Sequence, residues 1–389
     1  MSGARLRVLQ VGKFFPPYRG GVETYVKSLC DELRHQVEIE VLVANTGPRT
    51  VREVVDGVPV TRVASFGGAR SVPLTPRLPL ELGRAAADVV HLHTPNPVAE
   101  LAYLASPLAR RTRLVVTWHA DVVRQRWLGR LYRPVARRLL ARADAICLAT
   151  PRHLRTSALL LRYAAKCHVC TFGVDVARLG IDDHAAAAAV HDRYGGRPLV
   201  LAVGRLVYYK GFEVLIEAMR GLDATLLIVG DGPLRARLAA RVERLGLAGR
   251  VHLLGEEPDL RPFFAACDVF VLASTHRSEA FGIVQLEAMA LQKPVVSTRL
   301  GTGVDWVNVD GTTGLTVPPG DPAALRAAMA RLLADPALRA RLGANGRRRV
   351  EAYFTTRQAA EAVLGVYRQV TGTTEAPGSA SEGGARHVA

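Results

Sequence analysis

Short runs of aliphatic and β-branched residues alternate along this chain with longer segments in which apolar residues recur at helical spacing. Continuous apolar runs of this length are typical of buried strands, and the longer segments are typical of helices that cover a sheet. Strands are predicted at residues 5–11, 37–44, 58–64, 88–92, 113–118, 144–148 and 167–171, and again at 198–204, 224–229, 250–253, 268–272 and 294–297. This alternation predicts an α/β fold with parallel, doubly wound sheets.

The length of 389 residues predicts more than one core, and the pattern divides the chain into two similar units. Two Rossmann-like units, residues 1–181 and 198–354, are expected to face each other across a cleft. An alanine-rich helical linker, residues 182–197, separates them. A helix at 355–371 is expected to pack back towards the first unit, and the tail at 372–389 has the composition of a disordered segment.

The apolar runs and the cysteines indicate the cellular compartment of the protein. No apolar run approaches the ~18–20 residues of a membrane span, and the residues after Met1 lead directly into a predicted strand rather than a signal peptide. We therefore expect a cytoplasmic protein. The five cysteines include Cys167 and Cys170 at CxxC spacing, but no second pair completes a zinc site. Reduced, structural cysteines are the expected state.

The positive charge is concentrated in the first half of the chain. Residues 1–195 hold 28 Lys and Arg against 16 Asp and Glu, which is +12 of the total of +16. Ten arginines lie between Arg110 and Arg142, opposed only by Asp121. Such a segment attracts anionic lipid, nucleic acid or a phosphorylated substrate, although a solvated arginine-rich surface needs no partner. No nucleic-acid recognition motif accompanies the charge, and no nucleic-acid partner is expected.

Several candidate residues follow predicted strands, where ligands of open α/β sheets bind. Gly20 and Gly21 end a loop after the first strand, and His93 and His119 end two later ones. The first loop is not a GxGxxG sequence and lacks a convincing acidic partner for a ribose, which disfavours a nicotinamide enzyme. Arg205 and Lys210 follow the strand at 198–204. The planar guanidinium of arginine can bind phosphate through two N–H groups, and the ammonium of lysine adds a compact second charge.

The stretch 278–289 combines a loop, a glycine at the turn and the start of a helix. The free N–H groups and the dipole of a helix N-terminus favour an anion. Glu279 lies just before the helix and Glu287 lies within it, so we predict that they hold opposite ends of one phosphate-bridged ligand. The alternative is an ordinary strand–helix connection with two surface glutamates.

Taken in order, three motifs resemble the retaining nucleotide-sugar glycosyltransferases of family 4, which have the two-domain GT-B fold. They are Gly20-Gly21-Val22-Glu23, Gly204-Arg205 with Lys210-Gly211, and Glu279-x7-Glu287 containing Phe281-Gly282. Each glycine loop is weak by itself, and the ordered set is specific. The resemblance extends to about residue 370.

The resemblance implies an acceptor-binding first unit and a second unit that binds the nucleotide sugar. Arg205 and Lys210 would hold the diphosphate and stabilise the leaving group, Glu279 would bind the hexose, Glu287 the ribose, and His119 would lie beside the sugar. His119, Arg205, Lys210 and Glu279 are therefore the expected catalytic residues. The other implied donor-binding positions are Gly20, Gly21, Leu254, Gly255, Ala280, Phe281, Gly282 and Ile283, and the implied acceptor-binding positions are Tyr18, His93, Arg124 and Arg126. No metal or cofactor is expected, and no DxD motif stands in a suitable loop.

Two further segments, Thr117–Gln125 and Gly301–Asn308, are similar to bacterial mannosyltransferases that build O-antigen or exopolysaccharide on lipid carriers. This likeness implies GDP-mannose as donor, a lipid-linked glycan or glycolipid as acceptor, retention of configuration, and a peripheral position on the anionic inner face of the cell membrane. Asp305 departs from a proline-like position in those relatives. The alternatives are a UDP-sugar transferase with a soluble acceptor, a nucleotide-sugar epimerase, a glycoside phosphorylase and a basic nucleic-acid-binding protein.

Overall fold

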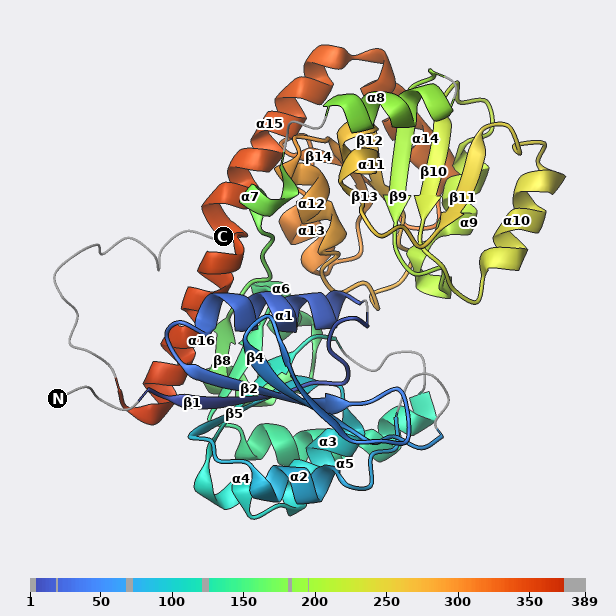
Figure 1. Cartoon of the computed structure of the whole chain (residues 1–389). Helices are drawn as coiled ribbons and strands as arrows, with labels where there is room; N and C mark the ends of the chain where they lie inside the picture. The colour runs from blue at the N-terminus through green and yellow to red at the C-terminus, as the bar shows by residue number, and fades with distance from the viewer. Residues whose placement is uncertain are drawn as a thin grey trace, which may run out of the picture.

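Two α/β units lie one above the other in a computed structural model of the chain, with the first unit in blue to teal and the second in green to orange (Figure 1). The structure describes residues 5–18, 20–67, 73–120, 126–180, 184–194 and 196–373, with the backbone alone for residues 126–131 and 184. No described helix is long and apolar enough to cross a membrane.

The first unit is built on an eight-stranded sheet in the order β3-β4-β2-β1-β5-β6-β7-β8. Every neighbouring pair is parallel except β3 and β4. The strands are β1 (Arg7–Val11), β2 (Glu38–Ala44), β3 (Val51–Val55), β4 (Val58–Val63), β5 (Val89–Thr94), β6 (Arg113–Trp118), β7 (Ala145–Leu148) and β8 (Cys167–Val169). The helices are α1 (Gly21–Leu33), α2 (Leu78–Arg84), α3 (Pro97–Ala105), α4 (Leu108–Arg111), α5 (Arg126–Arg142), α6 (Pro151–Thr156) and the 3-10 helix η1 (Leu160–Lys166).

The second unit has a six-stranded, wholly parallel sheet in the order β11-β10-β9-β12-β13-β14. Its strands are β9 (Leu199–Val203), β10 (Thr225–Val229), β11 (Val251–Gly255), β12 (Val269–Leu272), β13 (Val295–Thr298) and β14 (Gly314–Val317). Its helices are η2 (Tyr208–Lys210), α9 (Phe212–Ala218), α10 (Arg235–Arg244), α11 (Arg261–Ala266), α12 (Val284–Ala290), α13 (Gly303–Val307), α14 (Pro322–Ala334) and α15 (Pro336–Tyr353). Two short helices, α7 (Val176–Leu179) and α8 (His184–Arg193), join the units.

The structure confirms the predicted pair of doubly wound, Rossmann-like sheets and adds two strands that the hydrophobic pattern did not predict. The first, β3, is an antiparallel edge strand whose residues are almost all exposed, so it lacks the apolar run of a buried strand. The second, β14, has only four residues and begins with a glycine. An exposed strand lacks the apolar run of a buried one, and in β14 Thr316 separates Leu315 from Val317, so no continuous apolar run marks it.

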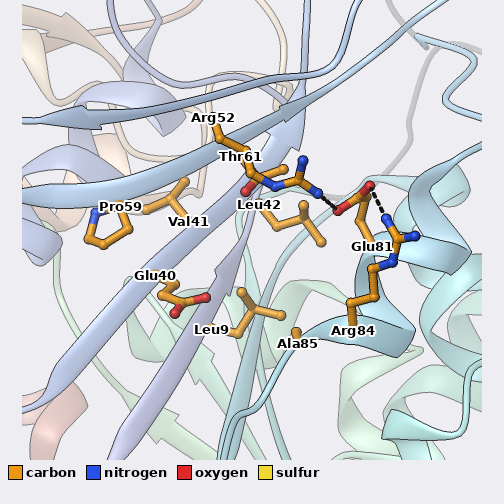
Figure 2. Close-up of a pocket in the computed structure, with 10 residues that line it drawn as sticks. All are labelled: Leu9, Glu40, Val41, Leu42, Arg52, Pro59, Thr61, Glu81, Arg84 and Ala85. Carbon is orange, nitrogen blue, oxygen red and sulfur yellow. Dashed lines mark hydrogen bonds and ion pairs between the residues drawn. The ribbon is translucent and has the colours of Figure 1, made fainter.

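A small cavity of about 150 Å³ lies between the first sheet and α2 (Figure 2). Leu9 and Leu42 form its floor, and the Glu81 carboxylate beside it is paired with Arg52 of β3 and Arg84 of α2. These ion pairs hold the edge strand to the helix. The cavity faces the middle of the sheet rather than the carboxyl ends of the strands, where ligands bind in such folds.

The last helix, α16 (Thr356–Thr371), leaves the second unit and packs on the first, against α1, β6 and β7 (red in Figure 1). A capping box of Thr355 and Gln358 begins it, and Tyr367 is fully buried among residues of the first unit. Before the crossing, α15 packs on α12, and Phe354 contacts Phe281 and Trp306. The α15–α16 pair therefore joins both units.

Two helical glycines should respond oppositely to alanine. At Gly343 in α15 a Cβ atom would lie 1.9 Å from the backbone oxygen of Gln292, whereas at Gly365 in α16 nothing lies within 4 Å. Alanine improves helix propensity by roughly 1 kcal/mol, but a clash with backbone costs about 1–3 kcal/mol. Gly343→Ala should therefore lower the free energy of unfolding, and Gly365→Ala should raise it by about 0.5–1 kcal/mol. Urea unfolding measures both, and equal effects would contradict the packing of α15 on the residues after α12.

Candidate active site

Each sheet has one place where the strand order reverses, between β1 and β5 in the first and between β9 and β12 in the second. The loops that leave two such strands diverge, and ligands of doubly wound folds bind between them. The loop after β1 carries Gly20, and β5 ends with His93 and Thr94. In the second unit, Arg205 follows β9 and Glu279 follows β12. The predicted residues thus gather at the two switch points.

The carboxyl edges of the two sheets face each other. Phe172, just after β8, packs on Phe281 with ring centroids 5.0 Å apart, and Arg152 forms an ion pair of 3.1 Å with Asp305. A Cβ atom on Gly303 would lie only 3.0 Å from Thr150 Cγ2 of the first unit. The carboxyl edges of the two sheets are therefore in contact, and Phe281 of the predicted donor segment lies at this contact.

Asp305, the position that departs from the relatives, has a clear role in this contact. Its carboxylate accepts hydrogen bonds from the backbone N–H groups of Leu300 and Gly301 at 2.9 and 2.8 Å, besides pairing with Arg152. The loop before α13 is thus closed by a side chain that also reaches the other unit.

Lys210 and Glu279 form an ion pair between the loops of the second switch point. Lys210 Nζ lies 2.7 Å from Glu279 Oε2, and both side chains are nearly buried. Burial by itself would lower the pKa of Lys210, but the adjacent Glu279 carboxylate and Tyr209 more than offset it, and the pKa is raised. Lys210 is therefore a cation at neutral pH. Gly211 makes the approach possible, because its φ is +70° and a Cβ there would lie 1.9 Å from the Ala273 oxygen.

The segment that contains Glu279 is anchored on several sides. Ser274 Oγ donates to the Glu279 carboxylate at 2.9 Å, and Thr302 Oγ1 donates to the Glu279 backbone oxygen at 2.9 Å. Further along, Gly303 N–H donates to the Ala280 oxygen at 2.8 Å. Gly282 has a φ of +71° and turns the chain into α12. Residues 279–283 therefore hold one conformation at the interface between the units.

Lys13 is a site residue that the sequence analysis missed. It lies in the loop after β1, and its pKa is lowered first by burial and also by the nearby charge of Arg205, while Glu23 acts in the opposite direction. Arg205 itself is exposed, and no described residue is paired with its guanidinium. One cation from each unit thus lies at this boundary, where their repulsion favours an anion between them. Its place in the same loop as Gly20 and Gly21 could have identified Lys13 from the sequence.

The glycines of the first loop allow a close approach between the units. Gly20 has an extended backbone before α1, and a Cβ on it would lie 2.2 Å from Glu23 Oε2, so the glutamate side chain folds back over it. A Cβ on Gly21 would lie 3.9 Å from Ile283 Cδ1 of the second unit. The first loop therefore lies directly against the segment that precedes α12.

The predicted base-binding residues, Leu254 and Gly255, end β11 two strands away from β9. Gly255 has a φ of +84° and joins Gly230 in a bridge, with Gly230 N–H donating to the Gly255 oxygen at 2.6 Å. Arg235 Nη2 donates to the Leu253 oxygen at 3.1 Å. Arg235 is a second residue that sequence reasoning missed, and its guanidinium lies beside the turn at Gly255.

His119 follows β6 in a nearly buried position beside the interface. Its ring stacks on Phe172 at 5.4 Å, and Phe172 in turn touches Phe281. His119 Nε2 lies 3.1 Å from His93 Nδ1, and His93 Nε2 lies 2.8 Å from Gln10 Oε1. Burial and the neighbouring histidines lower the pKa of both rings well below the usual range. Both histidines are therefore neutral. His93 lies between His119 and Gln10 and is the more buried of the two histidines.

The remaining predicted acceptor residues are less closely grouped. Tyr18 is exposed and stacks on Phe14, with ring centroids 4.3 Å apart. Arg126 begins α5, and Arg124 lies outside the described residues. Among the residues that the structure describes, no three His, Cys, Asp or Glu side chains are grouped so that they could hold a metal ion.

Glu287, in α12, is half-buried, and burial raises its pKa from 4.5 to about 7. A raised carboxyl pKa means that the folded protein favours the protonated acid. This contribution to stability is fully present below about pH 4.5 and is lost as the pH rises through about 7.

Glu287→Gln removes this titration. The melting temperature of the variant, relative to the wild type, should therefore increase between about pH 5 and about pH 8. The substitution Glu256→Gln, at an exposed glutamate, controls for the loss of one surface carboxylate. A difference between Glu287→Gln and the wild type that does not change with pH would contradict the burial of this carboxylate.

Family comparisons agree with this geometry. Residues 183–349 match the model of "Glycosyl transferases group 1", and residues 20–173 match that of "Glycosyl transferase 4-like domain". Among solved structures, sucrose-phosphate synthase from Thermosynechococcus elongatus superimposes with a TM-score of 0.81 at 25% identity, covering 95% of this chain and all of the other.

Several curated relatives match most of the chain. D-rhamnosyltransferase WbpZ of Pseudomonas aeruginosa is 37% identical, over 86% of this chain and 88% of its own. O-antigen chain mannosyltransferase C of Escherichia coli is 34% identical, over 72% and 75%. The GDP-mannose-dependent alpha-(1-6)-phosphatidylinositol monomannoside mannosyltransferase of Mycolicibacterium smegmatis is 32% identical, over 87% and 92%. With its two doubly wound sheets and facing switch points, the chain belongs to the family 4 glycosyltransferases of the GT-B fold.

Proposed function

We propose that this glycosyltransferase transfers mannose from GDP-mannose to a lipid-linked glycan or glycolipid, with retention of configuration and without a metal ion or cofactor. The observation that carries the proposal is the arrangement of cations at the two switch points. Lys210 is held by Glu279, while Arg205 and Lys13 approach the same boundary from opposite units. Two of the relatives are named as mannosyltransferases, and one of these as GDP-mannose-dependent.

The arrangement suits departure of a nucleotide diphosphate. As the bond between sugar and phosphate breaks, negative charge develops on the leaving phosphate and positive charge on the sugar ring. Cations lower the energy of the negative charge, and Lys210, held by Glu279, requires no rearrangement during the reaction. In this proposal Arg205, Lys210 and Lys13 hold the diphosphate, which makes a metal ion unnecessary. Glu279 holds hydroxyl groups of the hexose, and Glu287 holds those of the ribose.

Retention proceeds in this proposal by attack on the same face from which the diphosphate leaves. The leaving phosphate accepts the proton of the acceptor hydroxyl. Glu279 is already bound by Lys210 and Ser274, which suits a carboxylate that positions the donor rather than a nucleophile. The product of an α-linked donor would therefore be an α-glycoside, and a β-linked product in an NMR spectrum would contradict front-face attack.

Nucleotide binding provides the first test of the donor. GDP-mannose should raise the melting temperature by several degrees at concentrations well above its dissociation constant, whereas UDP-, ADP- and dTDP-sugars should raise it less. Stabilisation by UDP-sugars only would reject GDP-mannose as the donor.

Arg205→Gln should weaken the stabilisation by GDP-mannose and lower kcat by roughly 10²–10³, because it removes one preorganised group at the leaving phosphate. Arg220→Gln is a matched control, since Arg220 is an exposed arginine paired with Glu217 at the end of α9. Equal activity of the two variants would contradict the proposed diphosphate site.

The acceptor is proposed to reach the enzyme at an anionic membrane surface. Among the arginines between residues 110 and 142 whose side chains the structure describes, several lie on different parts of the first unit rather than on one face. Arg142 donates to the Ala109 and Thr112 oxygens and pairs with Asp144, so it stabilises the fold. Arg110 and Arg111 line a groove of about 1190 Å³ at the amino edge of the first sheet, opposite the candidate active site.

The exposed arginines of α5 are better placed for membrane binding than those of the far groove. This helix follows β6 and precedes β7, so it runs from the active-site edge of the sheet to the far edge. Arg133, Arg137 and Arg138 are exposed along it. A membrane against this face would leave the carboxyl edge of the sheet next to the lipid surface. A membrane against the far groove would hold the active site away from it.

Replacing Arg133, Arg137 and Arg138 together by Gln should weaken binding to anionic liposomes by about 3 kcal/mol, roughly a hundredfold, at about 1 kcal/mol for each arginine. Sedimentation of the wild type should decrease between about 0.05 M and about 0.5 M salt. The triple substitution of Arg5, Arg110 and Arg111 removes the same charge from the far groove and should have little effect. A larger loss from that control would contradict the proposed orientation, and salt-independent sedimentation would contradict electrostatic attachment.

A further inference from the structure

A continuous chain of buried hydrogen bonds runs from His119 to the last helix. From His119 it passes through His93 to Gln10 of β1, whose Nε2 donates to the Tyr367 hydroxyl of α16 at 2.8 Å. The Tyr367 oxygen lies 2.6 Å from His91 Nδ1, and His91 Nε2 lies 2.7 Å from Thr117 Oγ1. These side chains come from three neighbouring strands and from a helix that crosses from the second unit.

This chain of hydrogen bonds, with Gln10 oriented as in the structure, determines which nitrogen of His119 carries a proton. Gln10 Oε1 can only accept, so His93 Nε2 must donate to it, and the neutral His93 ring then has a bare Nδ1. His119 Nε2 must therefore donate to that nitrogen, which leaves His119 Nδ1 without a proton. At the other end, the Tyr367 hydroxyl accepts from Gln10, donates to His91 Nδ1, and leaves His91 Nε2 to donate to Thr117. Every bond has one donor and one acceptor.

The chain behaves as one unit because its polarity depends on Gln10. If the Gln10 amide were turned over, every bond would reverse, and His119 would present an N–H group at Nδ1 instead of a lone pair. Burial keeps one proton on each ring, since it lowers the pKa of His91 to about 3 and those of the other two histidines well below their usual range. The orientation of one amide therefore sets the tautomer of His119.

We propose that Tyr367, acting through Gln10 and His93, holds His119 as the neutral tautomer with a bare Nδ1, which accepts from the donor hexose. This inference rests on the proposed glycosyl transfer and adds positioning residues to it. No hydrogen bond joins His119 Nδ1 to another described residue, and the ring lies beside Phe172, which touches Phe281 of the donor segment. A lone pair presents the negative end of the ring dipole to the positive charge that develops on the sugar, whereas an N–H group would oppose that charge.

The position of Tyr367 gives the last helix a role in the reaction. Its hydroxyl is fully buried and accepts the hydrogen bond of the Gln10 Nε2 group. Because α16 continues from α15 of the second unit, the helix that joins the two units also supplies the acceptor for Gln10 in the hydrogen-bonded chain that ends at His119. Tyr367, Gln10 and His93 are positioning residues, since they act through His119.

The first test is spectroscopic and needs no substrate. Protein labelled with ¹⁵N-histidine should show His119 protonated at Nε2 and bare at Nδ1 in a two-bond ¹H–¹⁵N spectrum, with His119→Ala assigning the signal. Tyr367→Phe leaves the buried Gln10 N–H group without its acceptor, so the amide should turn over in part of the population and add the other His119 tautomer. A wild-type His119 protonated at Nδ1, or a spectrum unchanged by Tyr367→Phe, would overturn the inference. Either result is independent of whether the donor has been identified correctly.

The second test is kinetic and uses a matched control. Tyr103 is also fully buried, and its hydroxyl bonds to Thr112 Oγ1 at 3.3 Å, away from His119. Tyr367→Phe should lower kcat roughly 10- to 100-fold, the size expected for a misdirected group, with little change in donor KM. Tyr103→Phe should leave kcat near that of the wild type.

A double-mutant comparison separates positioning from general destabilisation. In a His119→Ala background, Tyr367→Phe should cause little further loss of kcat, because the group that it positions is already absent. Additive losses, or equal losses from Tyr367→Phe and Tyr103→Phe, would overturn the positioning role. Absence of transfer by the wild type with every sugar donor would instead reject the proposed function, while the tautomer measurement would still decide the inference.

Discussion

The buried ion pair between Lys210 and Glu279 is the interaction on which the second switch point depends. Removing two charges from water costs several kcal/mol for each ion, and only good geometry with further hydrogen bonds offsets that cost. Here the charged atoms lie 2.7 Å apart, and Ser274 adds a hydrogen bond to the carboxylate. The loops after β9 and β12 are therefore stable together rather than separately, and the segment from Glu279 to Ile283 is in position before any ligand arrives.

The two units bring different kinds of group to their common boundary. The second unit supplies the exposed cation Arg205 and the buried Lys210–Glu279 ion pair. The first supplies Lys13 together with His119, a neutral histidine at the end of a buried hydrogen-bonded chain. Breaking a bond between a sugar and a diphosphate separates negative from positive charge. In the proposed transfer, cations from both units face the developing negative charge and the lone pair of His119 faces the positive charge, so both units contribute groups to the site.

Much of the architecture was readable from the sequence because buried strands have a strong local signal. The twelve predicted strands form, and the pair of doubly wound sheets follows from their alternation with helices. The positions after strands were also informative, since parallel strands place their carboxyl ends on one edge. Arg205, Lys210 and Glu279 were identified in this way. The exposed β3 and the strand β14 were missed because β3 faces solvent and β14, Gly-Leu-Thr-Val, has no continuous apolar run.

The sequence by itself determined the family, the two sheets and most of the polar residues at the ends of their strands, because these depend on local periodicity and on motifs short enough to read. Only the tertiary structure decided how those residues are paired. Gln10 and Tyr367 are 357 positions apart and each resembles an ordinary core residue, yet they meet in one hydrogen bond that orients His93 and His119. Lys13 and Arg205 are likewise far apart in the sequence, yet their charges act on each other in the structure. Such contacts depend on how α16 crosses between the units and on how the two carboxyl edges face each other, and neither distance nor direction between remote segments is encoded in a local pattern.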